Sequence, residues 1–386
     1  MSSLYTMADA LAAARDETGL NDFGKDYSYE PLEAFITLVQ SDIQFTRAGF
    51  DNFKGMVQRH LVNHLRLQRD LAKHPEILNE DVSDPIMILG MPRTGTTKLQ
   101  RMISADPQMQ KLALWRLLNP APFDGDAPGV PGGRLLFARA VEEAAIANAD
   151  FTASHESAAE EADEDSYLLL LTFEYPLLFA LFPSKAYLNW VRARPRMPSH
   201  AYEKQLLQYL QWQDGGRKGR RWVLKNPGAV GCLKALHTIF PKATFVHSHR
   251  NMMDVMPSYC RLMEAAMAPL INNLDRHRHG RDSLEFWAYE MALYRQEREQ
   301  LRNSIDILDV EYLDIVKDPF PTIQLVYARA GVPFTAEAKA AMVAWSDRNQ
   351  LHKNGKAVYA LEDYGFTAER ISNAFAGLIP ATHMER

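Results

Sequence analysis

The sequence predicts an α/β protein with a central parallel sheet flanked by helices and a helical segment at its N-terminus. Short apolar runs rich in strand-forming residues alternate with helical patterns, which favours β-α-β units and a parallel sheet. One such run, residues 86–89, leads into a turn rich in glycine and hydroxyl residues and then into a helical pattern. Strand, glycine turn and helix in this order present backbone N–H groups to a phosphate. We therefore expect a P-loop-like, three-layer fold.

The remaining elements follow from the spacing of apolar residues. Helix-period apolar positions run through residues 6–75, and His74-Pro75 ends this pattern because the residue before a proline avoids the helical region. A C-terminal region, residues 336–378, is expected to form two helices around a basic loop. Further strands are expected at Arg221–Lys225, Ala243–His249 and Ile305–Val310.

We expect residues 1–386 to form a single domain, with residues 1–80 as a helical part packed on it. The sequence contains no low-complexity linker that would divide it, and 386 residues are enough to bury a large core. The net charge of −5 argues against a general nucleic-acid binder. Two cysteines give no disulfide framework, and the N-terminus does not resemble a signal peptide, so a cytoplasmic location is expected.

The most apolar stretch of the chain is Tyr167–Phe182. Glu174 and Pro176 interrupt it, and it is too short for a membrane span. We expect a buried helix or helix pair here. The alternative is the apolar wall of a pocket for a hydrophobic molecule.

The turn after the first strand has the spacing Gly90-x-x-x-x-Gly95, which is the start of the P-loop of nucleotide triphosphatases. Thr96 stands where that motif has its lysine, and the positive charge of the loop is Arg93 instead. A P-loop kinase or triphosphatase is therefore an alternative that rests on the glycine spacing alone. The loop, Lys225 and Arg250 all follow predicted strands, and because ligands of parallel sheets bind at the carboxyl ends of strands, we expect one shared site.

Four motifs in this order resemble those of sulfotransferases that use 3′-phosphoadenosine-5′-phosphosulfate (PAPS), especially the bacterial branch of that family. The likeness extends from about residue 55 to the C-terminus. Its motifs are Pro92-Arg-Thr-Gly-Thr-Thr97, Trp222-Val-Leu-Lys-Asn-Pro227, Arg250-Asn-Met-Met-Asp-Val-Met-Pro-Ser258 and Tyr359-Ala-Leu-Glu-Asp-Tyr-Gly-Phe366.

The resemblance implies a sulfotransferase domain that binds PAPS as co-substrate, without a metal. The sulfuryl group would move in line to a hydroxyl of a small acceptor. We expect the acceptor to be apolar because of the apolar stretch and the 16 methionines. The residues expected to bind the nucleotide are Arg93, Thr94, Gly95, Thr96 and Thr97 at the 5′-phosphosulfate, Arg250 and Ser258 at the 3′-phosphate, and Lys353 and Lys356 in a loop that closes over it or is only a mobile surface loop.

Catalysis needs cations at the leaving oxygen and a base for the acceptor proton. The resemblance assigns the first role to Arg93 and Lys225. It leaves the base open, because Pro227 and Ala229 stand where relatives have histidines. A nucleotide-binding relative without catalytic activity is therefore a further alternative.

We expect the base in the acidic segment 155–165. It contains two pairs of carboxylates four residues apart, and on a helix such like charges repel and raise carboxylate pKa values. The candidates, in order, are Glu164, Glu161 and His155. The alternative is a solvated acidic helix start. His247 and His249 share one face of a predicted strand, and without an evident third ligand we interpret them as core or rim residues.

Overall fold

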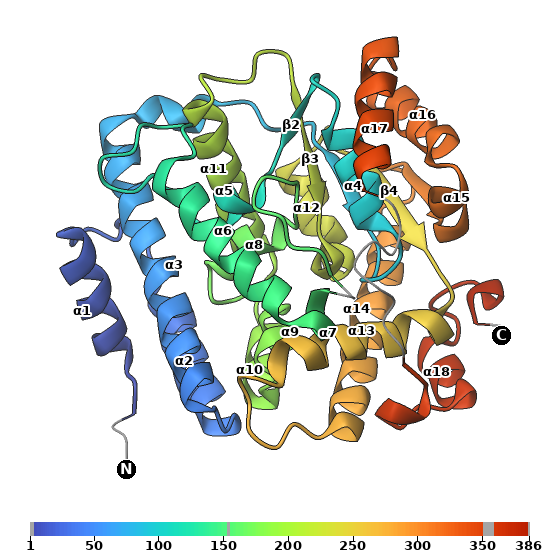
Figure 1. Ribbon diagram of the computed structural model, residues 1–386, viewed down its shortest axis with the longest axis horizontal. Coiled ribbons are helices and arrows are strands. Elements are labelled where there is room, and N and C mark those ends of the chain that lie inside the picture. Colours follow the sequence, from blue (N-terminus) through green and yellow to red (C-terminus); the bar gives the residue numbers. More distant parts are fainter. Residues whose placement is uncertain (1–3, 153–154, 350–358, 385–386) are drawn as a thin grey trace.

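A five-stranded parallel sheet in the order β2-β3-β1-β4-β5 forms the centre of the computed structural model (Figure 1), which describes residues 4–152, 155–349 and 359–384. The predicted strands are confirmed with shifts of one or two residues at their ends. The edge strand β2 was not predicted, because it has only three residues and no apolar run. The strands are β1 (Ile86–Leu89), β2 (Met109–Lys111), β3 (Arg221–Lys225), β4 (Thr244–His249) and β5 (Ile307–Glu311).

Helices cover both faces of the sheet and make the three predicted layers. On one face, Ile86 and Ile88 of β1 and Val246 of β4 pack against α4, α16 and α17. On the other face, Met87 and Phe245 belong to a larger core that includes residues of α12, α13 and α14. These helices are α4 (Thr96–Ser104), α12 (Leu233–Ile239), α13 (Met252–Met267), α14 (Arg276–Gln300), α16 (Pro319–Ala330) and α17 (Ala336–Arg348).

The N-terminal helices α1 (Met7–Thr18), α2 (Glu30–Asp42) and α3 (Arg47–Lys73) lie on one side of the molecule, and α15–α17 lie on the opposite side (Figure 1). The Thr46 side chain accepts a hydrogen bond from the Gly49 N–H and starts α3, which ends just before Pro75 as predicted. Apolar side chains of α2 and α3 join the larger core, so the helical segment is packed on the rest of the chain.

The apolar stretch Tyr167–Phe182 contributes to two short helices, α8 (Ser166–Leu170) and α9 (Leu178–Leu181), which agrees with the helix pair expected there. Among the described residues, no helix is both long enough and apolar enough to cross a membrane. The other helices are η1 (Pro75–Asn79), α5 (Leu114–Leu118), α6 (Gly132–Ala147), α7 (Ala149–Thr152), α10 (Lys185–Arg192), α11 (Met197–Gln213), η2 (Pro227–Cys232), α15 (Tyr312–Lys317), η3 (Glu362–Tyr364), α18 (Ala368–Phe375) and η4 (Ala381–His383).

The close approach of the β1–α4 loop to β4 requires a glycine at position 90. Gly90 has φ 136°, and a Cβ atom there would lie 2.7 Å from the backbone oxygen of Ser248. We expect Gly90→Ala to lower the free energy of unfolding by about 1–3 kcal/mol, measured by denaturant titration. Gly55→Ala is the control: it adds a Cβ to α3 in open space, and it should raise that free energy by about 0.5–1 kcal/mol. Equal stability of Gly90→Ala and the wild type would contradict the close approach.

Candidate functional site

The loop between β1 and α4 has the shape of an anion-binding turn. Gly90 and Gly95 both have positive φ, and no side chain caps the first turn of α4 in this described loop. The N–H groups at the start of α4, from Thr96 onward, are therefore available to a ligand. The Thr94 hydroxyl donates to the Met91 carbonyl oxygen at 2.7 Å, so it holds the turn closed.

Arg93, Arg250 and Ser258 come together around this loop. Arg93 Nε donates to Ser258 Oγ at 3.0 Å, and Arg250 Nη1 donates to the backbone oxygen of Arg93 at 2.8 Å. Ser258 reaches the loop because α13 begins at Met252, after Arg250, as the sequence required. Arg93 has φ 72°, a strained conformation that these contacts hold in place.

The electrostatics of this arrangement favour an anionic ligand. Burial lowers the pKa of Arg93, and the neighbouring charge of Arg250 lowers it further. The Nε–H of Arg250 is buried and has no hydrogen-bond partner among the residues that the structure describes, while its guanidinium group lies 4.2 Å from the ring centre of Tyr312. Two neighbouring arginines and an unused buried donor suit a phosphate group.

Lys225 is 1% exposed at the end of β3, where it is paired in register with Ile88 of β1. Its ammonium group donates to Glu164 Oε1 at 2.6 Å. The other oxygen of that carboxylate accepts from Ser166 Oγ at 3.2 Å. The candidate cation and the first-ranked candidate base therefore form one ion pair.

The acidic segment is not helical, so the expected stacking of like charges on a helix is wrong. Its backbone forms turns and one β-bridge, and it pairs with neighbouring segments instead. Asp163 N–H donates to the Leu112 oxygen at 3.1 Å, and Asp165 N–H donates to the Lys225 oxygen at 3.3 Å. Glu161 accepts from Trp345 Nε1 at 3.2 Å. The structure thus brings Glu164, but not Glu161, into contact with Lys225.

A cavity of about 190 Å³ opens beside the Lys225–Glu164 pair. Pro92 of the loop, Glu164 and His155 lie in its lining, together with Pro227 at the position where relatives have a histidine. Most of the remaining wall is apolar and comes from α7 to α9 and from α13: Phe151, Tyr167, Leu170, Leu177, Leu181, Leu262 and Met263. The apolar stretch is therefore both a buried helix pair and one wall of this cavity.

His155 lies beside a buried carboxylate. Its Nε2 is 3.8 Å from Asp163 Oδ2, and Asp163 is fully buried. Desolvation acts to raise the pKa of Asp163, but the hydrogen bond and charge of His155, with the charges of Lys225 and Arg101, hold it below its usual range. Asp163 is therefore an anion that lies close to the His155 ring at the cavity.

Three lysines and one alanine lie in or near the sequence motifs described above. Lys98 donates to the Val316 oxygen at 3.2 Å, so its ammonium group does not replace the missing P-loop lysine. Ala229 is buried in η2. The predictions for Lys353 and Lys356 concern residues outside those that the structure describes.

A buried polar network behind the ion pair was missed by the sequence reasoning. Asn226 follows Lys225, as Asp165 follows Glu164, and Asn226 Nδ2 donates to Asp165 Oδ2 at 3.1 Å. Tyr175 donates to Asn226 Oδ1 at 3.0 Å. Asp165 also contacts Glu203, which lies 2.7 Å from His200 Nδ1. The sequence signal that could have indicated this network is Lys225-Asn226 at the end of β3, because a buried asparagine also needs a hydrogen-bond partner.

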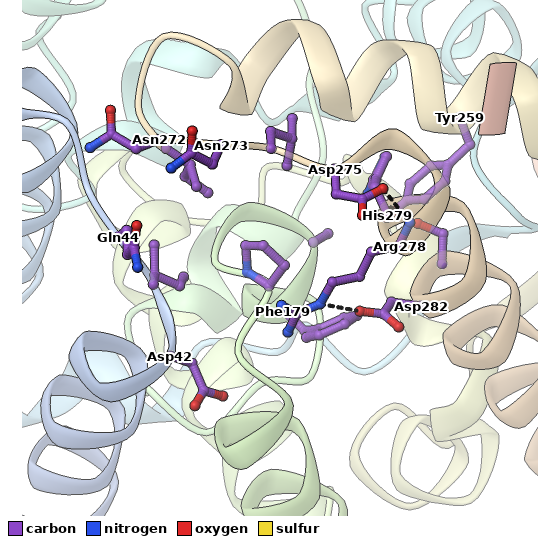
Figure 2. Close-up of a pocket in the computed structure, with 16 residues that line it drawn as sticks. Asp42, Gln44, Phe179, Tyr259, Asn272, Asn273, Asp275, Arg278, His279 and Asp282 are labelled. Carbon is purple, nitrogen blue, oxygen red and sulfur yellow. Dashed lines mark hydrogen bonds and ion pairs between the residues drawn. The ribbon is translucent and has the colours of Figure 1, made fainter. Parts of the chain in front are cut away.

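A larger cavity of about 330 Å³ lies next to the first (Figure 2). Ala180 and Tyr259 line both cavities. The lining of the larger cavity is more polar, and Figure 2 shows Arg278 directed toward Asp282, with Nε and Oδ2 3.5 Å apart. Among the described residues, none of those expected to bind the nucleotide lines it.

This site defines a class of protein: an α/β protein with a glycine loop for an anion and cations at three neighbouring strand ends. Such a site serves group transfer from a phosphorylated donor. The model of the Sulfotransferase family matches residues 85–336, which is more than half of the chain. The chain therefore belongs to the sulfotransferase family, as the sequence motifs indicated.

Relatives and solved structures agree with this assignment. One relative is omega-hydroxy-beta-dihydromenaquinone-9 sulfotransferase Stf3 of Mycobacterium bovis and of Mycobacterium tuberculosis, which is 26% identical to this chain over 257 residues. The match covers 64% of this chain and 63% of the relative, so it spans less than two thirds of the relative's length. The crystal structure of sulfotransferase STF1 from M. tuberculosis H37Rv is 27% identical, with a TM-score of 0.81 over 98% of this chain and 100% of that one. That of STF9 from Mycobacterium avium is 25% identical, with a TM-score of 0.84 over 98% and 96%.

The buried network makes the stability of the protein depend on pH. Burial raises the pKa of Glu203 from 4.5 to about 7 and that of Asp165 well above its usual range. The folded state then holds these protons more tightly than the unfolded state does. Their stabilising contribution is complete below about pH 4.5 and is lost as the pH rises through about 7.

We therefore expect Glu203→Gln to reduce the fall in Tm between about pH 5 and pH 8, measured by calorimetry. The control is Glu160→Gln, which removes an exposed carboxylate and should keep the wild-type slope. An unchanged slope in Glu203→Gln would contradict the role of this carboxyl group.

Proposed function

We propose that this protein is a PAPS-dependent sulfotransferase that transfers a sulfuryl group to a hydroxyl group of a small, apolar acceptor. The observation that carries the proposal is the position of the Lys225–Glu164 ion pair. It lies at an apolar cavity whose lining includes Pro92 of the anion-binding loop. A cation, a proton acceptor and an apolar binding space thus adjoin the site for the donor.

The loop and the two arginines account for binding of the donor. Arg93 and the N–H groups at the start of α4 face the 5′ end, whereas Arg250 and Ser258 supply donors for the 3′-phosphate. PAPS supplies an activated sulfuryl group when it is bound. Its leaving phosphate carries growing negative charge during transfer, and we assign Lys225, which is buried, and Arg93, which is partly buried, to oppose that charge.

Glu164 is the base that we assign to the acceptor hydroxyl. Its side chain is 23% exposed, and one oxygen binds Lys225 while the other accepts only the weaker bond from Ser166 in the described contacts. A carboxylate oxygen has two acceptor positions, so Glu164 can take the proton without releasing Lys225. His155, whose Nε2 lies 3.8 Å from Asp163 Oδ2, is the second candidate in the same cavity.

The apolar acceptor is supported by the cavity wall and by one relative. Six or more aliphatic and aromatic side chains face the base, and such a wall favours a hydrophobic molecule. The name of the relative Stf3 describes transfer to an omega-hydroxyl group of a menaquinone. We infer an alcohol or phenol on an apolar skeleton.

Removal of Arg250 should impair recognition of the 3′-phosphate. We expect Arg250→Ala to bind 3′,5′-bisphosphoadenosine about 10- to 100-fold more weakly in calorimetry, since charge-assisted hydrogen bonds contribute about 1.5–3 kcal/mol. ATP lacks that phosphate, so its weak binding should be alike in both proteins. The matched control is Arg281→Ala, at an exposed arginine of α14. Unchanged bisphosphate affinity in Arg250→Ala would refute the assignment.

Removal of the base should affect turnover but not donor binding. We expect Glu164→Gln to slow sulfate transfer from labelled PAPS to a panel of phenols, sterols and lipid alcohols by about 10²- to 10⁴-fold. The amide oxygen still accepts from Lys225, so bisphosphate affinity should stay at the wild-type level. Glu161→Gln, whose carboxylate contacts Trp345 instead, should retain activity. Wild-type turnover in Glu164→Gln would transfer the role to His155.

A further inference from the structure

The paired ends of β4 and β5 carry a cluster of imidazole and carboxylate groups that the proposed reaction does not use. Their parallel register aligns His247 with Asp309 and His249 with Glu311. The two imidazole rings are 4.2 Å apart. His249 Nε2 lies 2.7 Å from Asp309 Oδ1, and His247 Nδ1 lies 3.8 Å from the same oxygen. These three ligand atoms all lie within 4.8 Å of one another.

His247 has an available lone pair inside the cluster. It is 2% exposed, and its Nδ1 is buried without a hydrogen-bond partner in the described part of the chain. A buried ring nitrogen without a partner is unfavourable unless a ligand satisfies it.

The carboxylate of Asp309 is held in orientation from the side of α14. Arg298 donates to both of its oxygens, at 2.8 Å and 2.5 Å, and the ring of Tyr294 lies 4.5 Å from that of His247. Each carboxylate oxygen keeps a second lone-pair position, so these bonds leave Oδ1 able to bind an ion. Groups that orient a ligand in this way are typical of metal sites. Arg298 also weakens the donor strength of Asp309, so we expect weaker binding than at a closed structural zinc site.

A fourth donor adjoins the cluster. The ring of His383, in η4, is stacked on that of His249 at 5.4 Å with an interplanar angle of 5°. Its Nε2 contacts Glu311 Oε2 at 2.9 Å, and its Nδ1 is buried with no hydrogen-bond partner within residues 4–152, 155–349 and 359–384.

We propose that His247 Nδ1, His249 Nε2 and Asp309 Oδ1 bind a divalent transition-metal ion of the zinc class, with a fourth position open to water or His383. Two imidazoles and one carboxylate are a donor set that suits Zn²⁺. The ion replaces the proton between His249 and Asp309. Tetrahedral zinc with ligands at about 2.0–2.2 Å needs ligand atoms about 3.3–3.6 Å apart. The distances from His249 Nε2 and from His247 Nδ1 to Asp309 Oδ1 would therefore each change by less than about 1 Å.

The ion would join the ends of β4 and β5 one residue before Arg250 and Tyr312. It is therefore a structural site beside the nucleotide site, and its occupancy is independent of sulfuryl transfer. Binding to the folded state alone should raise Tm as the metal concentration rises.

The test is metal titration of the full chain after treatment with a chelator. We expect calorimetry with Zn²⁺ to give one saturable site per chain, and Co²⁺ to give the intense visible absorption of four-coordinate cobalt. His249→Gln, a polar change at a partly exposed position, should weaken Zn²⁺ binding more than about tenfold. His74→Ala removes an exposed histidine and should leave binding intact.

Two results would overturn the proposal. One is the absence of stoichiometric Zn²⁺ binding by the wild type. The other is unchanged Co²⁺ absorption in both His249→Gln and Asp309→Asn. Bisphosphate affinity, measured on every variant, reports whether each variant is folded. This measurement does not depend on the metal titration, so it separates failure of the metal site from failure of the proposed function.

Discussion

The ion pair between Lys225 and Glu164 is the interaction on which the rest of the site depends. A lysine that is 1% exposed is unfavourable without an opposite charge, because burial removes its hydration. Glu164 supplies that charge from a segment about 60 residues earlier in the chain. The pair therefore draws the acidic segment against the end of β3, and the buried bond between Asn226 and Asp165 reinforces the same junction. Removal of the whole Glu164 side chain would leave the buried Lys225 ammonium group without this partner.

Much of the donor side could be predicted from the sequence. Strands β1, β3, β4 and β5 are short apolar runs, and the rule that ligands bind at the carboxyl ends of parallel strands brought the loop, Lys225 and Arg250 together. Ser258 was expected near Arg250, whereas its hydrogen bond to Arg93 was found only in the structure. These inferences are local: each depends on residues close in the chain and on the fixed geometry of a parallel sheet.

The acceptor side could not be predicted in the same way. The spacing of the acidic residues suits a helix, but backbone bonds to Leu112 and Lys225 hold the segment in a non-helical conformation, and these partners are distant in sequence. Tertiary hydrogen bonds outweigh local propensity here. Asp309 was likewise not recognised as a neighbour of His247, because strand register cannot be read from either strand alone. The buried pairing of Asp165 with Glu203 has no sequence signal for the same reason.

The donor side and the acceptor side of the site are built from different elements, and this affects how the site can evolve. The groups assigned to the sulfuryl donor lie at the carboxyl ends of β3 and β4 and on the loop that Gly90 fits against β4. Small changes at these positions disturb the core. The acceptor wall comes largely from α8, α9 and one face of α13, whose aliphatic side chains can change size without moving Arg93 or Lys225. Acceptor preference can therefore diverge among relatives while the donor site is retained. A new preference would need only a few substitutions in this wall.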